Sequence, residues 1–147
     1  MIRKATLEDL PTLLELEKVC FRTNPYRKEQ IEWFLSTRKA VTFLSTRDDV
    51  AVGSVMLSIG GSEGKVVSIG VHPDWRGKGV AKELMKVADK WFTDLGVTVV
   101  GLEVSVQNPE AIRLYSSLGF EVKRTLKSYY SKREDAFYMR KEIPKVE

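Results

Sequence analysis

The stretch VHPDWRGKGVAKELM, residues 71–85, places two glycines and two cations where an extended, valine-rich run gives way to a helical pattern. A helix N-terminus presents unpaired backbone amides and a partial positive charge, which together attract phosphate. Gly77 and Gly79 have no side chains to keep a phosphate from those amides, and Arg76 and Lys78 supply charge. The turn is neither a Rossmann fingerprint nor a Walker A loop. A tight strand-to-helix connection is the alternative interpretation of the same glycines.

Hydrophobic periodicity on either side of this turn predicts the order of the elements. The expected helices lie around residues 10–19, 31–35, 78–95 and 109–118. The expected strands cover residues 1–4, 40–46, 50–59, 65–71, 97–106, 120–130 and 135–143. With no linker or internal repeat, residues 1–147 are expected to form a single α+β domain. Its central sheet is predicted to be mixed and mostly antiparallel, with helices on both faces.

Two of the helices have apolar residues at helical spacing, which predicts the faces that they bury. The first follows a possible capping box of Thr6 and Asp9, and its predicted apolar face is Leu10, Leu13, Leu14 and Val19. The third ends at Gly96, and its predicted apolar face is Val80, Leu84, Val87, Ala88, Trp91 and Leu95.

Composition excludes several classes of function. The net charge of +4 allows an acidic ligand, but no helix-turn-helix, zinc-finger or aromatic-basic motif favours nucleic acid. Cys20 is the single cysteine, so no intramolecular disulfide can form, and we expect a packing residue in a reducing compartment. His72 is the single histidine and lies in an ordinary turn, which argues against a zinc site or a Ser-His-Asp triad. No apolar run approaches 18 residues, so we expect a cytoplasmic protein with no metal and no membrane partner.

Glu103 is the charged residue that stands out within a predicted core strand. In VTVVGLEVSV the residues Val100, Leu102, Val104 and Val106 share one face, which places Glu103 on the other. A carboxylate in the middle of such a strand is uncommon unless it is paired or takes part in chemistry. Two interpretations follow, a salt bridge to a nearby Lys or Arg and a general base.

The strand SIGV, the Arg-x-x-Gly-x-Ala turn and the later NPEAIRLYSSLGF segment together resemble the GNAT N-acetyltransferase family. The resemblance covers nearly the whole chain and implies a site for acetyl-CoA, with CoA as product. By this resemblance, backbone amides of the turn would bind the pyrophosphate, and the edge of the strand would bind the pantetheine arm. A backbone amide near Val71 would stabilise the thioester oxyanion. The residues that it assigns to this cofactor are Ile69, Gly70, Val71, Arg76, Gly77, Lys78, Gly79, Val80, Ala81, Asn108 and Tyr115.

The same resemblance assigns catalytic roles to Glu103 and Tyr115. It supports Glu103 as general base, acting directly or through water, and gives Tyr115 the role of general acid toward the CoA sulfur. A core tyrosine is the alternative for Tyr115, and a plain helix N-cap is the alternative for Asn108.

The closing stretch SYYSKREDAFYM resembles the RimI and Ard-type branch, whose members acetylate the N-terminal α-amine of proteins. By that resemblance Glu103, Tyr129 and Tyr130 contact the acceptor peptide, and Phe21, Pro25 and Tyr26 form an opposite wall. An aromatic patch on an edge strand is the alternative for the two tyrosines. The chain departs from the branch at Ser105, where relatives commonly have Arg, and at Thr23-Asn24, where they often have an acidic residue.

The pKa of the protonated acceptor amine also favours α-amines. An α-amine has a pKa of about 7.7–8.0 and a lysine about 10.4, so far more of the α-amine is neutral at pH 7. A lysine or small-molecule amine acetyltransferase on the same scaffold remains the alternative enzyme, and a non-catalytic CoA-binding module is the alternative outside enzymes. The sequence leaves open whether the chain acts alone, as a homodimer or with an auxiliary subunit.

Overall fold

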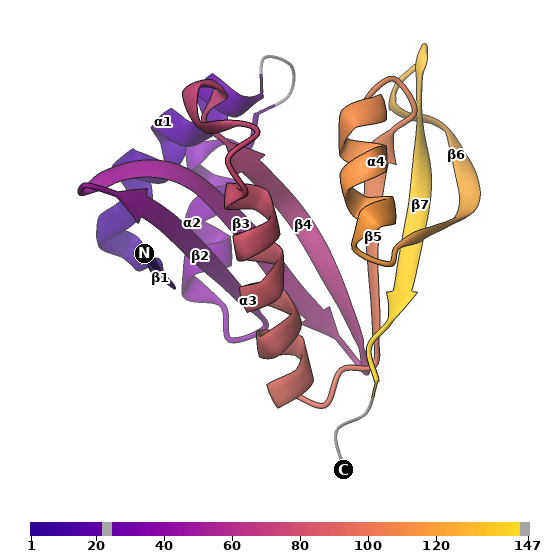
Figure 1. The fold of residues 1–147 in the computed structure, drawn as a ribbon, viewed down its shortest axis with the longest axis horizontal. Coiled ribbons are helices and arrows are strands. Elements are labelled where there is room, and N and C mark those ends of the chain that lie inside the picture. Colours follow the sequence, from indigo (N-terminus) through magenta and orange to yellow (C-terminus); the bar gives the residue numbers. More distant parts are fainter. Residues whose placement is uncertain (22–24, 145–147) are drawn as a thin grey trace. The chain divides into compact units, whose positions relative to one another are not determined.

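The computed structural model of the chain describes residues 1–21 and 25–144, and its elements follow the predicted order (Figure 1). The helices are α1 Leu10–Cys20, α2 Lys28–Ser36, α3 Val80–Asp94 and α4 Pro109–Ser117. The strands are β1 Ile2–Lys4, β2 Ala40–Arg47, β3 Val50–Gly60, β4 Glu63–Val71, β5 Val99–Ser105, β6 Glu121–Ser131 and β7 Glu134–Glu142. They form one sheet in the order β1-β2-β3-β4-β5-β7-β6. The predicted α+β class is confirmed.

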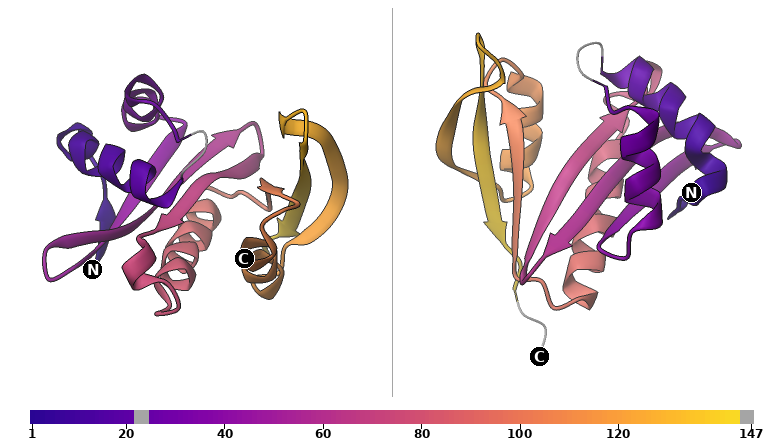
Figure 2. Two further views of the ribbon diagram at one scale, coloured as in Figure 1. Left: turned by 90° about the horizontal axis from the view of Figure 1, so that it is seen from above. Right: turned by 180° about the vertical axis from the view of Figure 1, so that it is seen from behind.

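The chain divides into two compact units, of which the first comprises residues 1–59 and 66–91. Here β2 pairs antiparallel with both β1 and β3. Helices α1 and α2 cover one face of these strands and α3 covers the other, which confirms helices on both faces (Figures 1 and 2). Under α1 and α2 lies an apolar cluster of Leu13, Leu16, Ile31 and Leu44. On the other face Gly53 lets α3 approach closely, since a Cβ there would lie 3.1 Å from Val80.

The second unit comprises residues 60–65 and the chain from 92 onward. Strand β5 pairs in parallel with residues 63–65 of β4 and antiparallel with β7, which forms a hairpin with the edge strand β6. Helix α4 runs beside β5 and β7 (Figure 1). Its C-terminal end is held by Lys141, whose Nζ donates to the Leu118 carbonyl at 3.3 Å and lies over the Phe120 ring. A cation at this end of a helix is favourably placed.

The helix faces differ from the prediction at their ends. Val19 is 39% exposed and Leu95 is 49% exposed, so neither belongs to the core. Glu17 is buried in α1 and Phe92 is buried in α3. Phe92 fills the space over Gly64, where a Cβ would lie 2.5 Å from the ring. Spacing among apolar residues alone could not show that a carboxylate takes one of the inward positions.

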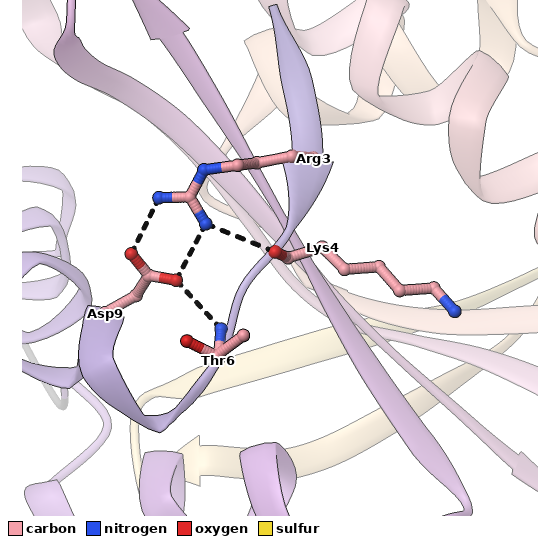
Figure 3. A network of polar contacts seen from close by, with 4 residues as sticks. All are labelled: Arg3, Lys4, Thr6 and Asp9. Atoms are coloured by element: carbon pink, nitrogen blue, oxygen red, sulfur yellow. Dashed lines mark hydrogen bonds and ion pairs between the residues drawn. The ribbon is translucent and has the colours of Figure 1, made fainter.

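The N-terminal strand is joined to α1 by a polar network (Figure 3). The Thr6 amide donates to Asp9 Oδ2 at 2.8 Å, while the two Asp9 oxygens accept hydrogen bonds of 2.8 and 2.9 Å from the Arg3 guanidinium. The Thr6–Asp9 capping box is thereby confirmed. Residues Leu7–Asp9 form a separate 3₁₀ turn, so α1 begins at Leu10, later than the capping box alone suggested.

Candidate active site

The glycine turn before α3 has the tight backbone of a strand-to-helix connection, and phosphate binding by this turn stays a prediction. Gly77 has φ +76° and Gly79 has φ +83°, a region that L side chains adopt only with strain, so the backbone itself requires glycine. A Cβ at either position would meet nothing within 4 Å, so open space lies over both residues. The first turn of α3 begins at Val80, with Ala81 beside it. Open backbone at a helix N-terminus fits the pyrophosphate of a CoA thioester.

The cations of this turn have partners within the first unit. Arg76 donates from Nε to the Val71 carbonyl at 3.1 Å, which turns its side chain back toward the end of β4. Lys78 Nζ lies 5.2 Å from the centre of the Trp75 ring. His72 accepts the Asp74 amide at Nδ1 over 3.1 Å, the capping contact of an ordinary turn. Support for a phosphate by Arg76 and Lys78 stays a prediction.

The end of β4 packs against the end of α1. A Cβ at Gly70 would lie 3.1 Å from Cys20 Sγ and 3.2 Å from the Phe21 ring, so glycine permits this contact. Cys20 is thus a packing residue, as its position in the helix predicted, and burial raises the pKa of its thiol. Ile69, Gly70 and Val71 are all partly exposed, and their predicted contact with pantetheine stays a prediction.

Glu103 lies at the centre of a small polar cluster in the second unit. Its side chain is 18% exposed, and Lys65 Nζ lies 3.2 Å from its Oε1. Burial and the negative charge of the nearby Glu103 carboxylate raise the pKa of Tyr129. The predicted alternation of side chains between the two faces of β5 is confirmed, with Val100, Leu102 and Val104 buried. The salt bridge foreseen as an alternative is present, and the role of Glu103 as general base stays a prediction.

Tyr115 lies on α4 and is only 9% exposed. Its ring packs edge-on against Phe120, with 6.0 Å between centroids. Burial raises the pKa of Tyr115 well above its usual value, and the nearby Tyr130 adds to the shift. A hydroxyl in this environment stays protonated at neutral pH, as a general acid must. Asn108 Oδ1 accepts the Ala111 amide at 3.2 Å, so the predicted N-cap is confirmed.

The residues predicted to contact an acceptor fall into both units. Tyr129 and Tyr130 are exposed on the edge strand β6, with ring centroids 4.9 Å apart. Phe21, Pro25 and Tyr26 belong to the first unit, where the Tyr26 ring meets Phe34 edge-on. The departure at Thr23-Asn24 lies outside the described residues.

The other departure, Ser105, has a partner in the closing hairpin. Its hydroxyl donates to Glu134 Oε2 at 2.6 Å. A serine is short enough to make this contact directly beside β7, so the position serves the local hydrogen bonding of β5 and the hairpin.

Glu17 is a buried polar residue that the sequence analysis missed. This carboxylate is 7% exposed, and its Oε2 accepts the Tyr26 amide at 3.2 Å. Burial raises its pKa, while the Tyr26 amide and a hydrogen bond from Ser68 act in the opposite direction. The available signal was an acidic residue one turn after Leu13 on an otherwise apolar helix face.

Comparison with known proteins decides the family. The acetyltransferase (GNAT) family matches residues 7–120. The chain belongs to this family. It is an acetyl-CoA-dependent N-acetyltransferase, and the open glycine turn before α3 fits a donor of that chemistry.

Individual relatives agree with this assignment. An uncharacterised N-acetyltransferase of Methanocaldococcus jannaschii is 30% identical over 98% of this chain and 92% of its own length. An N-alpha-acetyltransferase of Saccharolobus solfataricus is 31% identical over 94% of this chain and 90% of its own length. The fold superposes on the ribosomal-protein-S18-alanine N-acetyltransferase of Escherichia coli with a TM-score of 0.91 at 24% identity, covering 100% of this chain and 96% of that one.

The described residues contain neither a membrane-spanning helix nor a metal-binding cluster. No helix within residues 1–21 and 25–144 is long and apolar enough to cross a bilayer. Over the same residues, no three side chains of the His, Cys, Asp and Glu types come together in a way that could hold a metal ion.

Proposed function

We propose that this enzyme transfers the acetyl group of acetyl-CoA to the N-terminal α-amine of proteins or peptides. The observation that carries the proposal is the proximity of Glu103 to Tyr129, whose pKa is raised by burial and by the negative charge of Glu103. It joins the candidate base to one of the two tyrosines expected to hold the acceptor backbone. The relatives named N-alpha-acetyltransferase support the same acceptor class. The single cysteine supports a reducing compartment, which we take to be the cytoplasm.

The chemistry that we assign is direct attack of the amine on the thioester carbonyl. The C–N bond forms, the C–S bond breaks, and one amine proton passes to Glu103, directly or through water. Tyr115 donates its hydroxyl proton to the departing thiolate, since its raised pKa keeps the hydroxyl protonated at neutral pH until the thiolate forms. Backbone amides near Val71 stabilise the oxyanion, and amides of the Gly77–Gly79 turn bind the pyrophosphate.

The free energy needed to deprotonate the acceptor amine also favours an α-amine. Deprotonating an α-amine at pH 7 costs about one pKa unit, or ~1.4 kcal/mol, and a lysine about 3.4 units, or ~5 kcal/mol. One carboxylate that is already ion-paired with Lys65 suits the smaller task.

A peptide panel tests the acceptor. The enzyme is incubated with acetyl-CoA and two matched sets of peptides, one with a free α-amine and its lysines blocked, the other with a blocked α-amine and free lysines. Fragment mass spectra then locate the added acetyl group. We expect label on the α-amine of the first set. Label confined to the second set would show a lysine acetyltransferase, and acetyl-CoA binding without any labelled peptide or amine would show a binding module.

A further inference from the structure

Glu17 is a buried carboxylate to which the reaction assigns no proton transfer. It lies on α1 beside the apolar cluster that contains Leu13 and Leu16, and it is 7% exposed. A buried ionisable group usually contributes less stability than an apolar side chain of similar volume would at the same place. Stability of the fold alone therefore does not explain why this buried position holds a glutamate.

The contacts of Glu17 join three segments of the first unit. From α1 its carboxylate accepts the Tyr26 amide at 3.2 Å, and Ser68 of β4 is near enough to lower its pKa. The next amide along the chain, that of Arg27, donates instead to Gln30 Oε1 at 2.8 Å. The backbone at residues 26–27 is thus held by two side chains, and Glu17 is the one that links it to α1 and the strand.

Other contacts hold the surroundings without Glu17. The end of α1 is fixed to β4 by the packing of Cys20 and Phe21 on Gly70. The Tyr26 ring rests edge-on against Phe34 of α2, with centroids 5.9 Å apart. Removing the carboxylate would therefore release mainly the backbone at Tyr26 while the helix and the strand stay in place.

We infer that Glu17 is a positioning residue that sets the backbone of Pro25 and Tyr26 for the acceptor. The inference rests on the proposed function, because it takes these two residues as part of the acceptor wall. Glu17 acts through the Tyr26 amide and touches neither reactant. Its loss affects acceptor binding and leaves the binding of acetyl-CoA unchanged.

Three variants separate positioning from mere stability. Glu17→Met removes the acceptor oxygens at similar volume, Glu17→Gln keeps one, and Glu15→Met makes the same change at an exposed position of the same helix. For Glu17→Met we expect the peptide KM to rise about 10-fold with the acetyl-CoA KM within about twofold of the unchanged enzyme, the size expected for one charge-assisted hydrogen bond. Glu17→Gln should recover most of the loss, and Glu15→Met should show none.

Hydrogen exchange gives a readout that does not depend on activity. In Glu17→Met the Tyr26 amide should exchange at least about 10-fold faster, while the Arg27 amide, bonded to Gln30, keeps its rate. If Glu17→Met proves too unstable to purify, Glu17→Gln takes its place, because its amide loses the charge of the acceptor, and smaller increases in the exchange rate of the Tyr26 amide and in the peptide KM are then expected.

The outcomes distinguish this inference from the proposed function. A peptide KM unchanged in Glu17→Met, or a parallel rise in the KM of both substrates, would overturn the positioning role. Unchanged exchange at Tyr26 would overturn the anchoring contact itself. If the unaltered enzyme labels no peptide α-amine, the proposed function fails, and the exchange rates still decide whether Glu17 holds Tyr26.

Discussion

Lys65 Nζ and Glu103 Oε1 lie 3.2 Å apart, and this pair joins β4 to β5 within the second unit. The two residues lie on strands whose register runs from Glu63 opposite Val99 to Lys65 opposite Gly101. The parallel pairing therefore brings the lysine close to a carboxylate two residues further along β5. The ion pair with Lys65 orients the Glu103 carboxylate.

Replacement of Glu103 separates a base from a simple ion-pair partner. We expect Glu103→Gln to lower kcat by roughly 10²–10⁴-fold, because the amide keeps the shape and loses the ability to accept a proton. Lys65→Met removes the ion pair and keeps the carboxylate, so its kcat should stay within about 10-fold of the unchanged enzyme. Steady-state rates over a range of pH provide the measurement. Equal losses in the two variants, with an unchanged pH profile in Glu103→Gln, would remove Glu103 as the base.

Tyr115→Phe tests the general acid with little change in packing. The ring would keep its edge-on contact with Phe120, so the melting temperature should change little. Loss of the hydroxyl should lower kcat by roughly 10²–10⁴-fold. Because the pKa of Tyr115 is raised, the rate of the unchanged enzyme should not fall through ionisation of this group even near pH 10, the usual value for a phenol. A large drop in melting temperature with kcat preserved would show that Tyr115 is a packing residue of the core and not the general acid.

Local patterns predicted the fold and much of the candidate site. Strand alternation placed Glu103 opposite the buried valines of β5, and an Asn-Pro pair identified the cap of α4 because both effects act between neighbours in sequence. Lys65 and Glu17 could not be found in this way. The partner of Lys65 lies 38 residues away and depends on strand register, and the partner of Glu17 is the backbone amide of Tyr26, which side-chain patterns do not reveal.

Gly96, which follows α3, is a matched control for the two glycines of the turn before that helix. Gly77, Gly79 and Gly96 all have positive φ, and a Cβ at any of them would meet nothing within 4 Å. Substitution by alanine should therefore cost each a similar strain, about 1–2 kcal/mol. We expect Gly77→Ala and Gly79→Ala to raise the acetyl-CoA KM about 10-fold or more, because the methyl group enters the space over the anion-binding amides. Gly96→Ala should lose similar stability with an unchanged acetyl-CoA KM. Equal KM values in all three variants would show that Gly77 and Gly79 serve only the conformation of the turn.

Asn108 tests whether a helix cap also serves the cofactor. Asn108→Ala removes the acceptor of the Ala111 amide and should lower the free energy of unfolding by about 1 kcal/mol. Asn108→Ser should restore this stability, since serine is also a good N-cap. If Asn108 also contacts acetyl-CoA, both variants should raise the acetyl-CoA KM, measured at saturating peptide. A normal KM in Asn108→Ser would restrict the residue to capping.

The Arg3–Asp9 pair predicts a pH dependence of stability at the N-terminal end. Hydrogen bonding to Arg3 lowers the pKa of Asp9 from 3.8 to about 2, so the folded state holds this carboxylate in its charged form. The stabilisation is fully present above the unfolded pKa near 4 and is lost as the pH falls toward 2. Asp9→Asn should therefore be less stable than the unchanged protein in urea unfolding at pH 7 and at pH 5, and the difference should shrink at pH 3. Glu8→Gln, at an exposed position of the same turn, is the control and should not reproduce this trend. A difference that stays constant from pH 7 to pH 3 would show that the ionised pair does not contribute.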